Sequence, residues 1–376
     1  MPDGFRIHRV SRPAEVEAFI RFPFRLYGSA PHWSPPLLME RRDFLDPRKN
    51  PVFEYAKIQP FLALRGSEVV GTIAAISNGR YGEFHPDEQH VGFIGLFECI
   101  QDQTAADALF SAASEWLKGE GKTAMRGPVN LTTNDVVGLL VDGFDDPPTV
   151  MMPYNHTYYA GLFEAAGFSK AKDLFAFSLA KHTYGGQLEA VAAKLQARGR
   201  VKIRPVDLGR WRQELEFVRS CYNKAWAKNW GFVPWTDREL AFIAKELKPL
   251  IDPHLTFVAE VDEQPAGFLI AVPDANEAIK LARGRLFPFG LLKILWKLKV
   301  RKCSRLRTIA MGVLPEHRRR GIDAILVHHL IRNGVARGYS VSEMGWILED
   351  NEAMLSPLRR LGAERTKTYR VYDHPI

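Results

Sequence analysis

The residues best suited to chemistry form an arginine-rich turn in the second half of the chain, Val313-Leu314-Pro315-Glu316-His317-Arg318-Arg319-Arg320-Gly321-Ile322-Asp323-Ala324. Proline and glycine mark a turn, and the apolar periodicity after Gly321 predicts a helix. The first N–H groups of a helix lack helical partners and lie at its positive end, so they favour an anion such as a diphosphate. Arginines add charge-assisted hydrogen bonds to such an anion. The alternative is a surface turn with solvated arginines.

This turn resembles the acyl-CoA signature of the GNAT acyltransferase superfamily, V-x-P-x-x-R-x-x-G-x-G/A. The resemblance implies that acyl-CoA is the cosubstrate and that the end of the preceding strand holds its pantetheine arm. It assigns cofactor binding to Met311, Gly312, Val313, Arg318, Arg319, Arg320, Gly321, Ile322, Asp323 and Ala324. Asp323 departs from the pattern, because the superfamily has Gly or Ala there. An acid in the first helical turn suits the helix dipole but must point away from a polyphosphate.

Trp346-Ile347-Leu348-Glu349-Asp350-Asn351-Glu352-Ala353, followed by Leu358 to Gly362, resembles the closing motif of the same superfamily. In that motif an Asn opens the last helix beside the cofactor arm, so the resemblance assigns Asn351 to cofactor binding. The superfamily often has a tyrosine four residues before the glycine as the acid for the departing thiolate. This chain has Leu358 there. A water, Ser356 or a group from the other half would have to protonate the sulfur.

Several side chains are candidates for the general base. An amine acceptor with a pKa of about 10 arrives protonated, so a base must remove one proton before the amine attacks a thioester. The candidates are Glu343 on the next strand, Glu349 and Asp350 at its end, and Glu98 or His156 from the first half, with Glu349 and Glu98 favoured equally. Each glutamate is also typical of a solvated or salt-bridged surface acid. The chain has no Gly-x-Ser-x-Gly elbow, which agrees with direct transfer without an enzyme nucleophile.

The chain contains an internal repeat. Phe5 to Val10 is echoed by Val201 to Val206, a predicted hairpin over residues 61–74 by one over 257–270, and Leu162 to Phe168 by Pro357 to Ala363. We therefore expect an α+β protein of two tandem GNAT-like domains, 1–190 and 191–376, each with a mixed central sheet flanked by helices. The second copy should contain a strand at 307–314, a helix at 321–338, a strand at 341–347 and a helix from 351. The apolar stripe of the long helix is predicted from Ala324, Leu326, Val327, Leu330, Ile331 and Val335.

The first copy lacks the CoA signature, because residues 95–103 carry neither the arginines nor a glycine before the helix. It has instead two loops rich in Asn, Tyr and His, which are common substrate-contact residues on rigid loops. The candidate substrate contacts are Asn130, Asn134, Tyr154, Asn155, Tyr158 and Tyr159. The alternative is that these are turn residues that hydrogen-bond to their own backbone.

Positive charge is concentrated in one segment. The chain has 51 Lys and Arg against 43 Asp and Glu, a net charge of +8, and residues 280–307 contain ten of the basic residues and no acid. A nucleic-acid partner would favour a more extended distribution, so none is expected. Within 284–302, Lys293, Lys297 and Arg301 share one helical face while Leu291, Ile294, Leu295 and Leu298 share another, a pattern typical of a helix in a membrane interface. The alternative is an amphipathic helix packed on its own domain.

The overall composition is that of an ordinary globular protein of 376 residues, with 46% hydrophobic and 25% charged residues. The start lacks an apolar signal segment and no run of about 18 apolar residues occurs, so we expect a cytoplasmic protein that docks peripherally on the inner membrane. Cys99, Cys221 and Cys303 lack ligand or disulfide spacing, which predicts reduced buried thiols and no metal site.

The whole chain is similar to the tandem-GNAT proteins that include the bacterial ceramide synthases, which join an acyl-CoA to the amine of a sphingoid base. The similarity rests on Phe97-Glu98-Cys99, the Gly127-Pro128 loop, Arg285 to Gly290, the arginine turn and Trp346 to Asn351. It implies an acyl-CoA-dependent N-acyltransferase that makes a ceramide-type lipid. The alternatives are an N-acetyltransferase for a small soluble amine and a non-catalytic acyl-CoA-binding protein.

Overall fold

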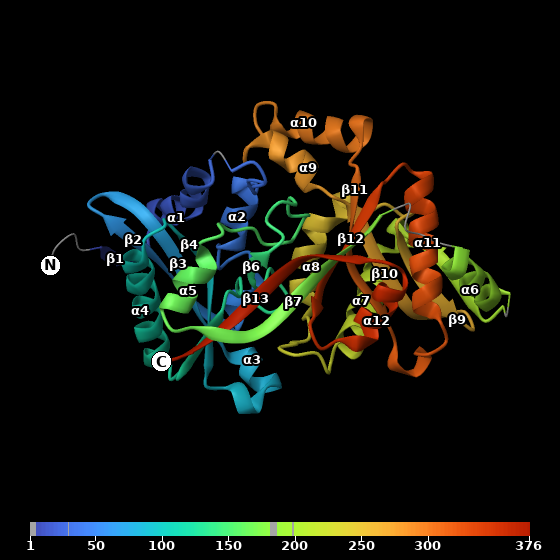
Figure 1. Ribbon diagram of the computed structural model, residues 1–376, viewed down its shortest axis with the longest axis horizontal. Helices are drawn as coiled ribbons and strands as arrows, with labels where there is room; N and C mark the ends of the chain where they lie inside the picture. The colour runs from blue at the N-terminus through green and yellow to red at the C-terminus, as the bar shows by residue number, and fades with distance from the viewer. Residues whose placement is uncertain (1–4, 29, 181–185, 198) are drawn as a thin grey trace. The chain divides into compact units, whose positions relative to one another are not determined.

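The computed structural model describes residues 5–28, 30–180, 186–197 and 199–376. They fall into two compact units, each built on its own part of a β-sheet with helices packed against it (Figure 1). The first unit contains Met1–Leu174, Ile279–Leu291 and Lys367–Ile376, and the second contains Phe175–Ala278 and Leu292–Thr366. The first unit therefore includes two segments that are distant in sequence from the rest of it.

The sheet of the first unit has the strand order β1-β2-β3-β4-β5-β13, with β6 paired to β13. All its pairings are antiparallel except β4 with β5, which is parallel, so the sheet is mixed. The strands are β1 (Arg6–Arg9), β2 (Ala56–Arg65), β3 (Glu68–Asn78), β4 (Val91–Cys99), β5 (Ala124–Gly127), β6 (Leu139–Asp142) and β13 (Glu364–Pro375).

The chain's last strand belongs to this first sheet. Tyr372 pairs with Gly127, and Pro375 pairs with Ala124. Tyr369 and Tyr372 are fully buried there. The C-terminal segment thus forms part of the core of a unit that is otherwise built mainly from the first half of the sequence.

The main helix of the first unit is α4 (Gln103–Gly119), whose Leu109, Phe110 and Leu117 enter the core. Asp102 caps its start by accepting hydrogen bonds from the N–H groups of Thr104 and Ala105 at 3.0 and 3.2 Å. The other helices of this unit are α1 (Pro13–Leu26), α2 (Leu38–Phe44), α3 (Gly79–Phe84) and α5 (Tyr159–Ala165).

The sheet of the second unit has the order β12-β11-β10-β9-β8, and residues 175–180, the end of β7 (Ser169–Ala180), lie beside β12. Only β11 and β12 are parallel. The strands are β8 (Val201–Pro205), β9 (Thr256–Val261), β10 (Gln264–Pro273), β11 (Arg305–Val313) and β12 (Val341–Leu348). The helices are α6 (Gly186–Gln196), α7 (Trp211–Ala225), α8 (Asp237–Leu247), α9 (Asn276–Ile279), α10 (Gly290–Trp296), α11 (Ile322–Ala336) and α12 (Glu352–Arg360), of which α9 and α10 cross the boundary between the units in sequence.

The two units repeat the same element order, as the internal similarity predicts. The β2–β3 hairpin corresponds to β9–β10, β4 to β11, α4 to α11 and α5 to α12. The predicted strands, long helix and last helix of the second copy are confirmed within two residues at nearly every end. The domain division at 190 and 191 stays a prediction, since the compact units also exchange short segments.

The predicted apolar stripe of α11 is only partly right. Leu326 and Leu330 are buried as expected, but Ile322 and Ile325 are buried as well and Val335 is exposed. Because α11 is apolar on most of its circumference, periodicity alone did not fix which side faces the sheet.

The three cysteines are buried free thiols, as predicted. Burial raises the pKa of Cys99, Cys221 and Cys303 to about 12, so each is a protonated, unreactive thiol at neutral pH. No helix in the described part of the chain is long and apolar enough to cross a membrane.

Candidate functional site

The arginine turn joins β11 to α11 in the second unit. A single 3-10 turn, Pro315–His317, follows β11, and the chain then enters the left-handed region at Arg319 (φ 63°) and Gly321 (φ 76°). A Cβ atom on Gly321 would lie 2.4 Å from Cδ1 of Leu195 in α6, so both conformation and space favour glycine here.

This turn presents free backbone donors. Within the described part of the chain, the N–H groups of Gly321, Ile322, Asp323 and Ala324 donate to no acceptor, as the first turn of a helix requires. The three arginine side chains before them are exposed. Arg318 also donates to the carbonyl oxygen of Ala225 at 2.8 Å, which holds its side chain against the end of α7. The turn therefore has the donors and charge that a diphosphate needs.

The end of β11 offers further main-chain groups. β11 and β12 pair from Arg305 with Val341 to Thr308 with Met344, and beyond that point β11 continues to Val313 paired only with β10. Backbone groups of β11 on the β12 side are thus available to an extended arm. Gly312 must be small, because a Cβ atom there would lie 2.7 Å from the indole ring of Trp226.

Sequence reasoning did not place Trp226 at this strand. Its ring stacks on Tyr222 with centroids 4.5 Å apart, and Tyr222 stacks on Trp235 at 3.8 Å. Trp226 and Tyr222 pack in one cluster with Ala310 of β11 within the second unit. The signal in the sequence was the aromatic run 226–235, but the strand that it packs against is set by the fold of α7 over the sheet.

Asn351 occupies the predicted place at the start of α12. Its carbonyl oxygen accepts from the N–H groups of Met354 and Leu355 at 2.9 Å, and its side chain does not cap the helix. Leu358, in the position of the absent tyrosine, is buried against Phe177, Ile347 and Leu355. The side chain at that position is therefore part of the core of the unit.

The two candidate bases in the second unit differ in environment. Glu343 is fully buried and forms an ion pair with Arg305 at 3.1 Å, an arrangement that favours a structural role at the start of β12. Glu349 follows the end of β12 and is partly exposed. Of the two, Glu349 has the better access to a ligand.

Glu98 and His156 belong to the first unit and come together there with several aromatic side chains. Tyr27, which ends α1, and Tyr159, which begins α5, both donate from their hydroxyl groups to Oε2 of Glu98, at 2.6 and 2.7 Å. The His156 ring stacks on Tyr27 with centroids 4.6 Å apart. Burial raises the pKa of Glu98 to about 7, against the opposing effect of the two hydroxyl donors.

A bulge in β4 sets the direction of Glu98. Leu96 has a left-handed backbone (φ 49°), and the register of β3 with β4 shifts between Thr72 and Ala74. The side-chain oxygen of Asn130 accepts from the N–H of Leu96 at 2.8 Å, and the Thr72 hydroxyl donates to its carbonyl oxygen at 3.0 Å. Asn130, predicted as a substrate contact, thus holds the strand that carries Glu98.

The other predicted substrate contacts have distinct surroundings. Asn155 is buried and bonds to both backbone groups of Leu140, at 2.7 and 3.0 Å, so it fixes its own loop. Tyr158 donates to the carbonyl oxygen of Cys99 at 2.7 Å, whereas Asn134 donates its backbone N–H to the Thr132 hydroxyl. Tyr154 is partly exposed beside Tyr27, with centroids 5.9 Å apart. The loop residues therefore divide into backbone anchors and rings around Glu98.

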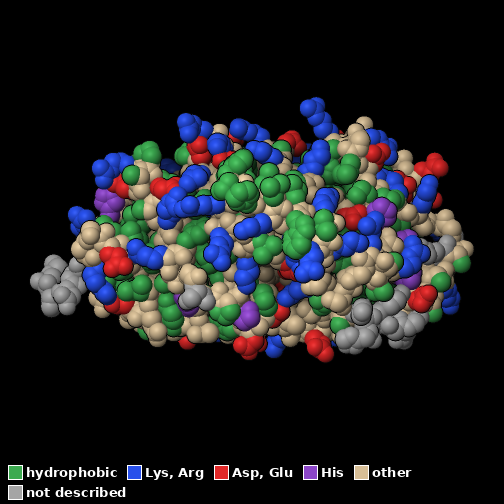
Figure 2. All heavy atoms as spheres, turned by 90° about the horizontal axis from the view of Figure 1, so that it is seen from above, with side chains coloured by type: hydrophobic (Ala, Val, Ile, Leu, Met, Phe, Trp, Pro, Cys, Tyr) green, Lys and Arg blue, Asp and Glu red, His purple; other side chains and the backbone are tan. Residues whose placement is uncertain are grey.

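The basic insertion exposes more apolar surface than its pattern predicts. Phe287, Leu292 and Val300 are 79%, 62% and 67% exposed. Phe289, Leu291, Leu295 and Trp296 are exposed as well. Figure 2 looks onto the face that carries this segment and shows hydrophobic side chains gathered beside Lys and Arg side chains. We call residues 287–300 the exposed apolar segment.

Two details of the predicted helix were wrong. Ile294 is buried and not part of the exposed face, and Lys297 forms an ion pair with Glu277 at 2.9 Å, so it points toward its own unit. Ile294 lies on α10, and Lys297 begins the helical turn that follows it, so both elements turn one side toward the rest of the chain. Lys293, Lys299 and Arg301 form no ion pair within the described residues.

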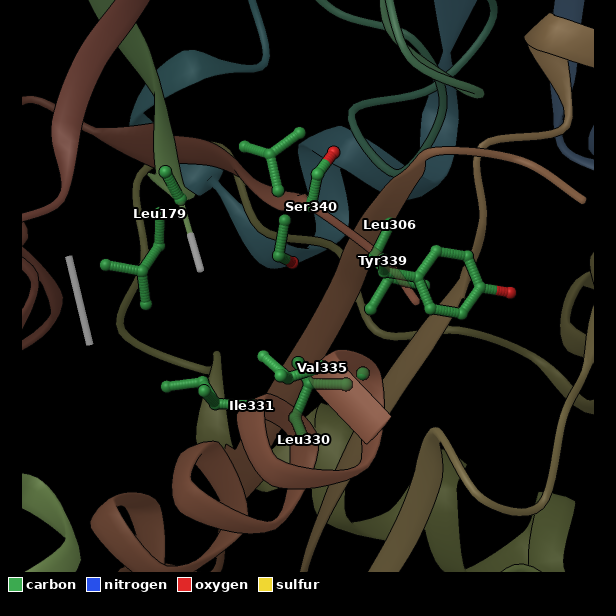
Figure 3. Close-up of a pocket in the computed structure, with 11 residues that line it drawn as sticks. Leu179, Leu306, Leu330, Ile331, Val335, Tyr339 and Ser340 are labelled. Atoms are coloured by element: carbon green, nitrogen blue, oxygen red, sulfur yellow. The ribbon is translucent and has the colours of Figure 1, made fainter. Parts of the chain in front are cut away.

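A separate, small apolar pocket of about 40 Å³ lies in the second unit (Figure 3). Its lining includes Leu179, Leu306, Leu330, Val335 and Tyr339. It touches the C-terminal end of α11, whereas the arginine turn lies at the N-terminal end, on the order of 20 Å along the helix axis. The pocket is therefore distinct from the candidate cofactor site.

Comparison with known protein families matches residues 215–363 to "Acetyltransferase (GNAT) family". The chain is 38% identical to "Bacterial ceramide synthase" of Caulobacter vibrioides, over 98% of this chain and 96% of the relative. It is 37% identical to "Protein YghO" of Escherichia coli, over 96% of this chain and 93% of that protein.

Among solved structures, a tandem GNAT protein from the clavulanic acid biosynthesis pathway aligns with a TM-score of 0.57 at 11% identity, covering 99% of this chain and 98% of that one. A GCN5-related N-acetyltransferase from Sphaerobacter thermophilus aligns with a TM-score of 0.53 at 14% identity, covering 100% and 96%. These similarities show the fold, two tandem α+β domains with mixed central sheets, as the sequence predicts.

Proposed function

Since the chain belongs to the acetyltransferase (GNAT) family and is an acyl-CoA:amine N-acyltransferase, we propose that its acceptor is the primary amine of a sphingoid long-chain base. The product would be a ceramide-type lipid. The near full-length relative named bacterial ceramide synthase supports this acceptor. The observation that carries the proposal is the exposed apolar segment, because an acceptor that lives in a bilayer must be reached at the bilayer surface.

The reaction we propose needs no covalent enzyme intermediate. The amine nitrogen attacks the thioester carbonyl, the amide C–N bond forms, the C–S bond breaks, and coenzyme A leaves as a thiolate that takes up a proton. The arginine turn would hold the diphosphate, and Asn351 and the backbone of Met311 to Val313 would hold the pantetheine arm and polarise the carbonyl. A water or Ser356 is the proposed proton donor to the sulfur.

The proton of the attacking amine needs an acceptor. We keep Glu349, Glu98, Glu343 and His156 as the candidates, with Glu349 and Glu98 preferred because both residues are partly exposed.

Identifying the product that the purified protein makes tests the proposed acceptor directly. With palmitoyl-CoA and sphinganine in mixed vesicles, we expect mass spectrometry to detect the N-acyl amide and one equivalent of free coenzyme A. Acetyl-CoA paired with water-soluble amines serves as the comparison. If acetyl-CoA and a water-soluble amine reacted faster and no lipid amide formed, the acceptor would be a small amine and not a long-chain base.

The exposed apolar segment is proposed to attach the protein to the inner membrane. Burying a large apolar side chain contributes about 1.5–3 kcal/mol, and each basic residue near anionic lipid contributes about 1 kcal/mol. Lys293 and Lys299 of this segment, and Arg301 directly after it, form no ion pair within the described residues. Together these contributions are sufficient for reversible attachment without a spanning helix.

Replacing Phe287, Leu292 and Trp296 by serine should lower binding to phosphatidylglycerol vesicles at least about tenfold in a flotation assay, because each side chain loses its apolar contact with the lipid. Phe84→Ser is the matched control, since Phe84 is a similarly exposed aromatic residue on α3 in the first unit. Equal flotation of the triple variant and the natural chain would contradict the proposed attachment to a membrane surface.

A further inference from the structure

We propose that Glu98 and the aromatic rings around it form a binding site for a primary ammonium group, and that the Glu98 carboxylate accepts the proton of that group. The site lies wholly in the first unit, which lacks the CoA signature. The identity of the ammonium as the acyl acceptor rests on the proposed function, but the binding site itself does not. Nothing in the repeat predicts it, because the corresponding strand of the second copy has no carboxylate.

The carboxylate has one oxygen reserved for a ligand. Both phenol donors, Tyr27 and Tyr159, bond to Oε2 of Glu98, and within the described part of the chain Oε1 accepts from no group. Among the described residues no Lys or Arg forms an ion pair with Glu98. Glu98 keeps partial exposure although most of its surroundings are apolar. A largely desolvated carboxylate with a free oxygen strongly favours a cation as its partner.

The surrounding rings suit a cation as well. Tyr27 stacks between Trp33, at 5.1 Å, and His156, at 4.6 Å. His156 also stacks on Tyr158 at 5.1 Å, and Tyr154 lies beside Tyr27. The faces of aromatic rings attract an ammonium group, and each well-placed ring adds about 0.5–2 kcal/mol.

The other titratable groups facing Glu98 are neutral near pH 7. Burial raises the pKa of Tyr27 and Tyr159 well above their usual value, and that of Cys99 to about 12. Burial lowers the pKa of His156, so its ring carries no charge that would compete with a ligand. Asp102, beyond the end of β4, is paired with Arg65 at 2.7 Å. The charge of the site is therefore that of Glu98 alone.

The proton transfer balances within the site. An ammonium R–NH3+ gives one proton to Oε1 of Glu98, which leaves a neutral amine with its lone pair and a neutral carboxylic acid. An ordinary glutamate is a poor acceptor for an amine of pKa about 10. A carboxyl group with a pKa of about 7 instead of 4.5 makes the same transfer about 300-fold more favourable. Burial of Glu98 thus serves both the binding and the deprotonation of an amine.

Isothermal titration of the full chain with n-octylammonium chloride tests the site without any acyl-CoA. We expect saturable binding at pH 8, no binding of the neutral n-octanol at the same concentration, and a loss of affinity of at least about tenfold in Glu98→Gln. The octylammonium stays charged from pH 6 to pH 8, whereas Glu98 protonates below about pH 7. The affinity of the natural chain should therefore fall about tenfold between pH 8 and pH 6, and this pH dependence should be absent in Glu98→Gln.

The control is Glu164→Gln. Glu164 also accepts a hydrogen bond from a buried tyrosine of the first unit, Tyr372, at 3.0 Å, but Glu164 itself is exposed. A second variant, Tyr154→Ala, removes a ring that makes no hydrogen bond in the described structure and should lower octylammonium affinity about threefold to tenfold while leaving the unfolding temperature unchanged. If Glu98→Gln, Tyr154→Ala and Glu164→Gln all bound octylammonium equally well, the proposed ammonium site at Glu98 would be wrong.

The two proposals fail in different ways. If octylammonium binds through Glu98 but no lipid amide forms with any acyl-CoA, the ammonium site stands and the sphingoid acceptor is wrong. If lipid amide forms normally in Glu98→Gln, the acceptor stands, and Glu98 is neither its binding group nor its base. Coenzyme A binding measured in the same variant should be unchanged, because the arginine turn belongs to the second unit.

Discussion

The double variant Arg318→Glu, Arg320→Glu is expected to bind coenzyme A at least about 100-fold more weakly than the natural chain. Each arginine would make charge-assisted hydrogen bonds to the diphosphate worth about 1.5–3 kcal/mol, so losing two of them costs about 3 kcal/mol or more. Both side chains are exposed beside the free N–H groups of Gly321 to Ala324. Reversing the charge also repels the phosphates, which adds to the loss.

The matched control lies on the same helix. Arg332→Glu, Arg337→Glu changes the net charge by the same amount at the C-terminal end of α11, since Arg332 lies on α11 and Arg337 directly follows it. Arg337 makes only a partly exposed ion pair with Asp252 at 3.4 Å. Its coenzyme A affinity should stay within about threefold of the natural chain, since more distant exposed charges are screened by salt. Equal losses in the two double variants would mean that the effect is one of overall charge, and the turn would lose its assignment.

Arg126→Met is expected to lower the free energy of unfolding of the first unit by about 3–5 kcal/mol. Arg126 is buried on β5 and forms two hydrogen bonds to Asp373 of β13, at 2.7 and 2.9 Å, and one to Glu88 at 2.9 Å. The variant leaves both carboxylates partly buried without their cation. Urea unfolding, together with hydrogen exchange of the β5 and β13 amides, measures the loss.

The exposed pair of Arg65 and Asp102 provides the comparison in the same unit, with an equal distance of 2.7 Å. Arg65→Met should cost less than about 1 kcal/mol, because solvent screens that pair. Lowering the pH further distinguishes the Arg126 contacts from the Arg65–Asp102 pair. Burial raises the pKa of Glu88, but hydrogen bonds from Arg126 and Tyr81 outweigh it and lower the pKa below its usual value.

The Glu88 contribution is therefore complete above the pKa of an unfolded glutamate and disappears as the pH falls through the lower folded value. The stability difference between the natural chain and Arg126→Met should shrink on acidification below about pH 4. A constant difference down to pH 2 would contradict the assigned role of the Arg126 contacts.

Local patterns in the sequence were sufficient to predict the position of the arginine turn in the second unit. The order strand, proline, arginines, glycine and apolar helix depends on residues within a dozen positions of one another, so each preference reinforces the next. Gly321 is a left-handed residue at the start of α11, as the motif requires. The repeat was equally visible, because its hairpins are local elements whose residues keep the same spacing.

Where helix periodicity was ambiguous, only packing decided the outcome. Ile294 and Lys297 were placed by pattern on faces that the structure turns toward the chain. A helix with apolar residues on several sides satisfies more than one rotation, and the neighbouring elements choose among them.

The sequence by itself determined the family fold, the repeated elements and the location of the arginine turn, since these follow from spacing along the chain. Only the tertiary structure decided what surrounds Glu98. Tyr27, Glu98 and Tyr159 are separated by 71 and 61 residues and meet because α1, β4 and α5 pack in one unit. It likewise decided that β13 lies in the first sheet. Burial and long-range pairing are properties of the packed chain, so the raised pKa of Glu98 and the buried contacts of Arg126 have no local signature.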